Sequence, residues 1–284
     1  MYTIHEIWIF LVQGLANGFI YALIALGYTL VYGVLRLINF AHSEVFMSGA
    51  FASYFILNAL VHINPLTGAG QPSGAASVGL VLLGILGGAA GGGAVAFCLE
   101  RVAYRPLRRR HAPTLAFLIS AIGASYFLYN LAGKEFGRLP LSIPTPFTSG
   151  VLFRAFGAPV TTYDAIVAGS TAAMLVLLDR VVATTRLGRG IRAVAQDAEA
   201  ASLMGVNIDR VISQTFVVGG LLGGAAGFLF GLSAGVVFTM GFTPAIKAFT
   251  AAVLGGIGNI RGAVLGGLLL GVVENVATIW TGAA

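Results

Sequence analysis

The polar residues between positions 36 and 44 are the first in this sequence whose types and spacing could do chemistry. Five of them lie between two long apolar runs: Arg36, Asn39, His42, Ser43 and Glu44. His42 and Ser43 are adjacent, so on a helix their side chains do not face each other and they make a poor catalytic pair. Two interpretations remain: an ordinary turn at the membrane surface, or a broken helix at depth whose freed backbone groups line a cavity.

Patterns for other chemistry are absent from the sequence. It contains neither the GxxxxGK[ST] pattern of a phosphate-binding loop nor the GxSxG pattern of a serine hydrolase. The four histidines are scattered without a nearby acidic or thiol cluster, and the single Cys98 excludes an internal disulfide. We therefore expect no catalytic residue, no metal and no cofactor.

The composition predicts the elements that must position these residues. Hydrophobic residues make up 57% of the chain and charged residues only 9%, against about 25% charged in an ordinary globular domain. This predicts an all-α, polytopic transmembrane bundle of about seven or eight membrane segments, some of them broken or re-entrant, forming a single domain over residues 1–284. The 40 glycines are spread along the chain, and the crowded runs at 87–93 and 219–227 indicate close packing between membrane helices.

Uncharged runs locate the expected membrane segments. They are predicted near 7–35, 45–62, 77–99, 114–132, 165–178, 211–246 and 248–284, with a Pro/Gly loop at 62–76 and a mixed loop at 134–162. The first run is too long for the apolar part of a cleavable signal peptide. Pro244 and Lys247 are predicted to mark a turn, and an interruption at 255–262 predicts a short, re-entrant piece. Arg261 and Glu274 are either interior polar groups or interfacial ones.

Basic residues predict the orientation of the chain. The 100–113 loop carries five arginines, the 179–210 segment five basic residues, and the 134–162 loop only three. Loops 100–113 and 180–210 are therefore expected in the cytoplasm. The net charge of +6 comes largely from these loops, where the basic side chains can contact lipid headgroups. It therefore does not indicate a nucleic-acid partner.

The 186–210 segment is the longest polar interruption in the chain and carries helix punctuation. Asp197 is predicted to cap a short helix from Ala198 to Met204, with Gly205 at its C′ position. Asn207 is predicted to cap the next membrane helix. We expect a structured helix–turn–helix that lies along the membrane rather than a flexible linker.

Four ordered motifs resemble one known family. Glu199-Ala200-Ala201-x3-Gly205 resembles the EAA-x3-G signature of ABC-importer permeases, a short helix that docks in a groove of an ATPase. Three companion stretches begin at Gly18 (GFIYALIALGYTLVYGVLRLINFAH), Glu100 (ERVAYRPLR) and Lys247 (KAFTAAVLGGIGNIRGAVLGG). Together they resemble the branched-chain amino-acid permease family of bacterial inner-membrane ABC importers.

The resemblance implies a function and partners. A second homologous permease chain would complete the translocation path, a periplasmic or lipid-anchored binding protein would deliver the amino acid, and two cytoplasmic ATPase subunits would drive transport. The implied ATPase-coupling residues are Asp197, Glu199, Ala200, Ala201 and Gly205. The candidates for the translocation path are Asn39, His42, Ser43, Glu44 and Glu274. The resemblance also favours the broken-helix interpretation of 36–44.

The sequence departs from the family pattern at three places. Ser43 stands where the family commonly has glycine, the coupling signature continues without a proline after Ile208, and a further apolar segment with a polar tail is expected after Trp280. The chain therefore resembles a truncated or divergent member. An amide- or urea-type solute and an ion-coupled secondary transporter remain as alternatives, and a purely structural membrane protein is a third.

Overall fold

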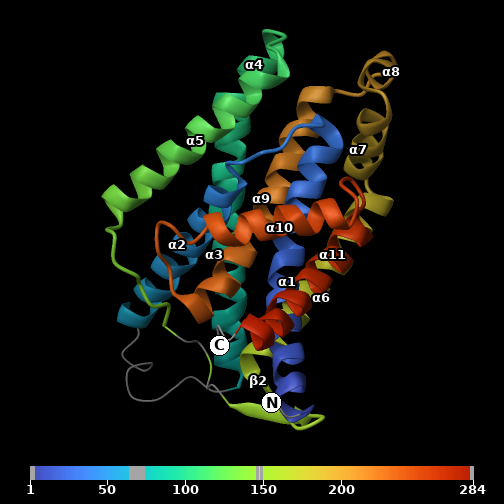
Figure 1. The fold of residues 1–284 in the computed structure, drawn as a ribbon. Helices are drawn as coiled ribbons and strands as arrows, with labels where there is room; N and C mark the ends of the chain where they lie inside the picture. Colours follow the sequence, from blue (N-terminus) through green and yellow to red (C-terminus); the bar gives the residue numbers. More distant parts are fainter. Residues whose placement is uncertain (1–3, 64–73, 145–146, 148–149, 282–284) are drawn as a thin grey trace.

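The computed structural model describes residues 4–63, 74–144, 147 and 150–281, and this part of the chain is mainly helical (Figure 1). The helices are α1 (Ile4–Leu35), α2 (His42–Ile63), α3 (Ala75–Leu99), the π-helix η2 (Glu100–Tyr104), α4 (Arg105–Arg109), α5 (Thr114–Glu135), α6 (Thr162–Thr184), α7 (Arg186–Gln196), α8 (Ala198–Leu203), α9 (Ile208–Ala234), α10 (Phe242–Leu254) and α11 (Ile260–Thr281). The predicted all-α membrane fold is confirmed.

Among the described residues, six helices could cross a membrane. These are α1, the continuous run from α3 to α4, and α5, α6, α9 and α11, each long and apolar enough to cross a bilayer. The apolar helix α10 is shorter, with 13 residues, and α2 has 22. Counted with α2 and α10, the apolar helices agree with the predicted seven or eight segments.

The core of the bundle is formed by α1, α2, α3 and α9. These helices pack on one another, and α11 packs along α1. By contrast, α5 and α6 lie at the periphery, where α5 stands apart from the central helices over much of its length (Figure 1). Helix α10 crosses the bundle near mid-height and contacts both α1 and α11 (Figure 1).

Glycine forms the seam between α2, α3 and α9. A Cβ added to Gly88 of α3 would lie 2.7 Å from the carbonyl oxygen of Gly224 in α9, and one added to Gly92 would lie 2.6 Å from the Gly224 Cα. Backbone therefore touches backbone along this seam, which only small residues permit. The two predicted glycine-rich packing surfaces meet each other here.

Two local predictions differ from the structure, and a third falls largely on residues that the structure does not describe. The mixed outer loop contains a two-stranded antiparallel hairpin, β1 (Val151–Ala155) and β2 (Ala158–Thr161), that was not predicted. The expected 14-residue segment at 165–178 is the 23-residue α6, because Asp164 closes a capping box with Thr161 instead of ending the helix. The Pro/Gly loop at 62–76 lies largely outside the described residues.

The predicted turn at Pro244 and Lys247 was wrong. Both residues lie inside α10, which begins at Phe242. Proline is tolerated there because the backbone N–H groups of a first helical turn have no partner within the helix. The predicted interruption at 255–262 matches the gap between α10 and α11.

Candidate functional site

The break between α1 and α2 lies inside the bundle. The ring of His42, the first residue of α2, packs between Gly27 of α1 and Gly223 of α9: a Cβ on these glycines would lie 2.6 Å from Cε1 and 3.1 Å from Nε2, respectively. Gly27 is eight residues before the end of α1, which corresponds to ~12 Å along the helix. Gly223 is 15 residues into α9, or ~22 Å from its start. The geometry thus favours a broken segment at depth over a surface turn.

Hydrogen bonds hold this break in one arrangement. The Asn39 side-chain oxygen accepts from the Ala41 backbone N–H at 3.1 Å and from the Tyr104 hydroxyl at 2.8 Å. It therefore directs the chain into α2 and ties the break to the π-helix η2. Glu44 Oε1 accepts from the hydroxyls of Ser43 and of Ser125 in α5, each at 3.0 Å.

Four of the five predicted path residues form this one buried cluster. Asn39, His42, Ser43 and Glu44 are each at most 4% exposed. Within the described residues, Nε2 of His42 has no hydrogen-bond partner. In this conformation the cluster is enclosed by the chain's own helices. The fifth residue, Glu274, lies elsewhere, on α11, in an ion pair with Lys247 of α10.

The predicted coupling segment forms two short helices, α7 and α8, with the expected caps. The Asp197 carboxylate accepts from the backbone N–H groups of Glu199 and Ala200, at 2.9 and 3.0 Å. Gly205, with φ +83°, donates to Ser202, and Val206 donates to Ala201, which is the Schellman pattern of a helix end. The Asn207 side chain caps α9. Local sequence therefore determines this turn.

The exposed side of α8 lacks Ala201, one of the predicted ATPase-coupling residues. Glu199 and Ala200 are exposed, but Ala201 is only 5% exposed and packs into the protein's own core. The most exposed apolar side chains of this segment are Leu203, at 89%, and Met204, at 84%. Neither residue was predicted from the sequence. A signal was available, since these two large apolar residues end the predicted short helix inside the longest polar segment of the chain.

An ion-pair cluster joins the arginine-rich stretch to the start of α9. Asp209 binds Arg105, Arg108 and Arg109, and Arg108 also binds the fully buried Glu100 at 3.0 Å. The second oxygen of Glu100 accepts from Ser213 of α9 at 2.6 Å. Most of these arginines thus have a defined partner within the chain, beyond the predicted role as an orientation signal.

The two basic regions lie at the same end of the molecule. The α4 and α8 labels lie together at one end of the bundle, and the termini lie toward the other (Figure 1). Arg36, at the end of α1, adds a link there by donating to the Ala195 carbonyl of α7 at 3.0 Å. The sequence left two positions possible for Arg261, the bundle interior or the membrane interface. In the structure Arg261 is exposed on the first turn of α11.

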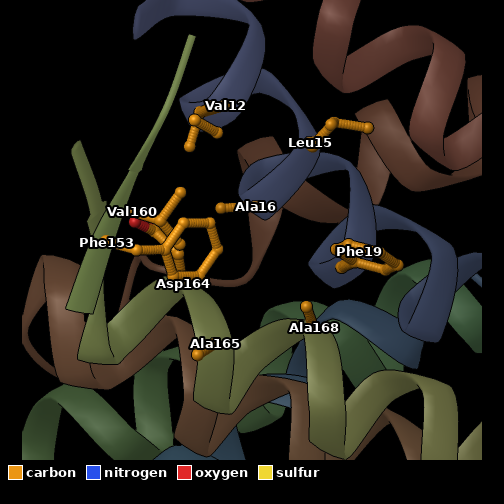
Figure 2. A pocket seen from close by; sticks show the side chains of 10 residues that line it. Val12, Leu15, Ala16, Phe19, Phe153, Val160, Asp164, Ala165 and Ala168 are labelled. Atoms are coloured by element: carbon orange, nitrogen blue, oxygen red, sulfur yellow. The ribbon is translucent and has the colours of Figure 1, made fainter. Parts of the chain in front are cut away.

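A cavity at the opposite end is unsuited to a polar solute. Figure 2 shows it between α1, α6 and the hairpin, with Val12, Phe19, Phe153 and Val160 among its apolar walls. Its one acidic lining residue, Asp164, accepts from the backbone N–H and the hydroxyl of Thr161, at 2.9 and 2.7 Å. Among the described residues, no group of three or more His, Cys, Asp or Glu side chains could hold a metal ion.

Comparison with known proteins identifies the family. The family model described as "Branched-chain amino acid transport system / permease component" matches residues 10–284. The chain belongs to this family.

Curated members of this permease family cover most of the chain. The high-affinity branched-chain amino acid transport system permease protein LivH of Salmonella typhimurium is 41% identical over 272 residues, 94% of this chain and 85% of LivH. BraD of Pseudomonas aeruginosa, with the same description, is 40% identical over 93% of this chain and 84% of its own length. The fructose import permease FrcC of Rhizobium meliloti is 37% identical over 41% of this chain and 33% of its own length. No solved structure matches the chain.

Family membership confirms two further predictions. The matched relatives are named as permease proteins of transport systems, so this permease is a transport subunit and not an enzyme. Its apolar spans and its bacterial relatives make it a multi-pass protein of the bacterial inner membrane.

Proposed function

We propose that this permease is a subunit of an ATP-driven importer of branched-chain or related amino acids. A second permease chain completes the path, an outer binding protein delivers the amino acid, and two ATPase subunits bind at the cytoplasmic end. The observation that carries the proposal is α8: a capped helix whose tip exposes two large apolar side chains, Leu203 and Met204, on a permease-family scaffold. Exposed apolar side chains gathered at one site are typical of a protein interface.

The ATPase-binding surface consists of the exposed side of α8. Leu203 and Met204 enter a groove of the ATPase, and Glu199 lies beside them as the polar contact. Asp197 and Gly205 act indirectly, since they hold the two ends of α8, while Ala201 anchors α8 to the permease core. The concentration of arginine at the same end supports a cytoplasmic location for α8 and for loops 100–113 and 180–210.

A chain of contacts that leads from α8 through α9 and η2 to the break before α2 supports a mechanical route for the energy of ATP. Helix α8 leads through the Asn207 cap directly into α9, where Asp209 binds Arg108. From the same cluster, η2 extends to Tyr104, whose hydroxyl holds Asn39 at the break. Movement of α8 thus pulls on the segment that encloses Asn39, His42, Ser43 and Glu44, and opening this segment exposes the translocation path.

Reconstitution tests this function. The permease, its second permease chain and the ATPase subunits are placed in proteoliposomes with ATP inside, and the loaded binding protein is added outside. We expect leucine uptake that requires ATP and survives ionophores that abolish ion gradients. Uptake that follows an ion gradient without ATP would indicate a secondary transporter, and the absence of any solute movement would indicate a structural role. Uptake of urea or acetamide in place of leucine would correct the substrate class.

A further inference from the structure

An ion pair between α10 and α11 lies against α1 near the middle of that helix. Lys247 of α10 binds Glu274 of α11, and the Lys247 ammonium also donates to the Tyr21 hydroxyl of α1 at 3.4 Å. The same ammonium lies 5.6 Å from the centroid of the Tyr21 ring, within the range of a cation–π contact. Three different helices thus contribute to one charged site.

The position along α1 places this site near the middle of the bilayer. Tyr21 is 17 residues from the first residue of α1 and 14 from the last, which corresponds to ~26 Å and ~21 Å along the helix. Helix α10, which carries Lys247, crosses the bundle at the same mid-height (Figure 1). Charged side chains at this depth are unfavourable in lipid, so they usually face a bundle interior or a water-filled cavity.

The ion pair is open to the surroundings of the chain. Each of its two side chains is 34% exposed, unlike the enclosed cluster at the start of α2. Thr243 and Thr250 are exposed on α10 at four and three residues from Lys247, so polar groups flank it on the same helical face. Ile246 is 48% exposed, and Phe242, Val253 and Leu254 add further exposed apolar surface on α10. The ion pair and its flanking threonines, at this depth, fit a water-filled path better than contact with lipid tails.

We propose that Lys247 and Glu274 bind the zwitterionic head group of the amino acid in transit. The substrate carboxylate pairs with the Lys247 ammonium and the Tyr21 hydroxyl, and the substrate ammonium pairs with the Glu274 carboxylate. The empty site is neutral because its two charges pair with each other, and the loaded site is neutral because each charge pairs with its counterpart on the substrate. This inference rests on the proposed function, since it requires an amino-acid cargo.

Single neutralising variants test the site in the complete transporter. Lys247→Met and Glu274→Gln are reconstituted with the ATPase subunits and the second permease chain, and leucine uptake and ATP hydrolysis are measured together with the loaded binding protein. Loss of one charge-assisted contact in the path should reduce uptake about tenfold or more, while hydrolysis stays near the wild-type rate. Arg261→Gln, an exposed site on the same α11, is the matched control and should keep normal uptake. Normal uptake in both neutralised variants would overturn the proposal.

A charge reversal separates substrate binding from a purely structural ion pair. Lys247→Glu combined with Glu274→Lys restores an ion pair but reverses it relative to Tyr21. We expect uptake to stay low in this double variant, and full recovery would overturn the proposal. If a neutralised variant does not reach the membrane, Lys247→Arg and Glu274→Asp test the same point: each keeps its charge and should therefore keep more uptake than the neutral variant at the same position. Tenfold losses with these conservative variants would mean that packing, not charge, matters. Uptake that needs no ATP in the wild type would instead refute the proposed function, while a tenfold loss of uptake in the neutralised variants would still support the site.

Discussion

Replacing Gly205 tests whether the shape of α8 determines ATPase binding. Gly205 has φ +83°, and a Cβ built there meets nothing within 4 Å, so a larger residue is opposed by backbone strain and not by a clash. A left-handed conformation costs an ordinary L-residue about 1–2 kcal/mol, and a β-branched residue is among the least tolerant. Helix α8 has six residues, one of them buried, and a cap on Asp197 that contributes about 1 kcal/mol. The strain is therefore of the same size as the contribution of this cap.

The assay is a graded series at this position. We expect co-purification of the ATPase with the permease to fall in the order Gly, Asn, Ala, Val, because asparagine tolerates the left-handed conformation better than alanine or valine. Amide hydrogen exchange in α8 should rise in the same order. Gly137→Val is the matched control: Gly137 has φ +86° and open space, but lies beyond the far end of α5. A Gly205→Val variant that keeps wild-type ATPase yield and slow exchange in α8 would refute the coupling role of this turn.

Three further changes have defined outcomes. Gly224→Leu should destabilise the detergent-solubilised protein by about 3 kcal/mol, measured by thermal unfolding, since its Cβ would overlap the Gly88 carbonyl. Arg108→Ala leaves the buried Glu100 without its cation and should lower the stability by about 3 kcal/mol in the same thermal unfolding measurement. This is the low end for a broken buried ion pair, because the Ser213 hydroxyl still donates to the Glu100 carboxylate. Asp197→Ala removes the α8 cap, worth about 1 kcal/mol, and should weaken ATPase binding without changing the melting temperature of the membrane helices.

Matched controls are available for these variants. A Cβ added at Gly169 of α6 meets nothing within 4 Å, so Gly169→Leu should unfold at the wild-type temperature. A loss of stability equal to that of Gly224→Leu would show that the close contact between Gly224 and Gly88 is not the cause. Arg110→Ala removes an exposed arginine from the same stretch as Arg108. Equal losses from both arginine variants would show that total positive charge, and not the pairing with Glu100, is responsible.

Local signals explain what the sequence could predict. Asp197, Gly205 and Asn207 were assigned correctly as caps because capping depends on residues three or four positions apart. The membrane segments follow from uncharged runs of sufficient length, and the glycine-rich surfaces from composition. Each of these features is complete within a short stretch of chain.

Contacts between distant segments could not be predicted in the same way. Lys247 was taken for a turn residue because its ion-pair partner lies 27 residues away on another helix, and nothing local reveals that pairing. The hydrogen bond from Tyr104 to Asn39 joins residues 65 positions apart, so no local pattern indicates it. Ala201 was assigned to the partner-facing side because the motif names the residue but does not say which way its methyl group points.

The glycine seam limits which mutations can be repaired genetically. A larger residue at Gly224 meets the backbone of Gly88, and since no residue is smaller than glycine, no substitution at Gly88 can make room for it. At Gly84 the obstacle is instead a side chain, because an added Cβ would lie 2.8 Å from Cε1 of the Phe228 ring. A selection for restored transport should therefore recover suppressors of Gly84→Ala that shorten Phe228, and only true revertants of Gly224→Leu.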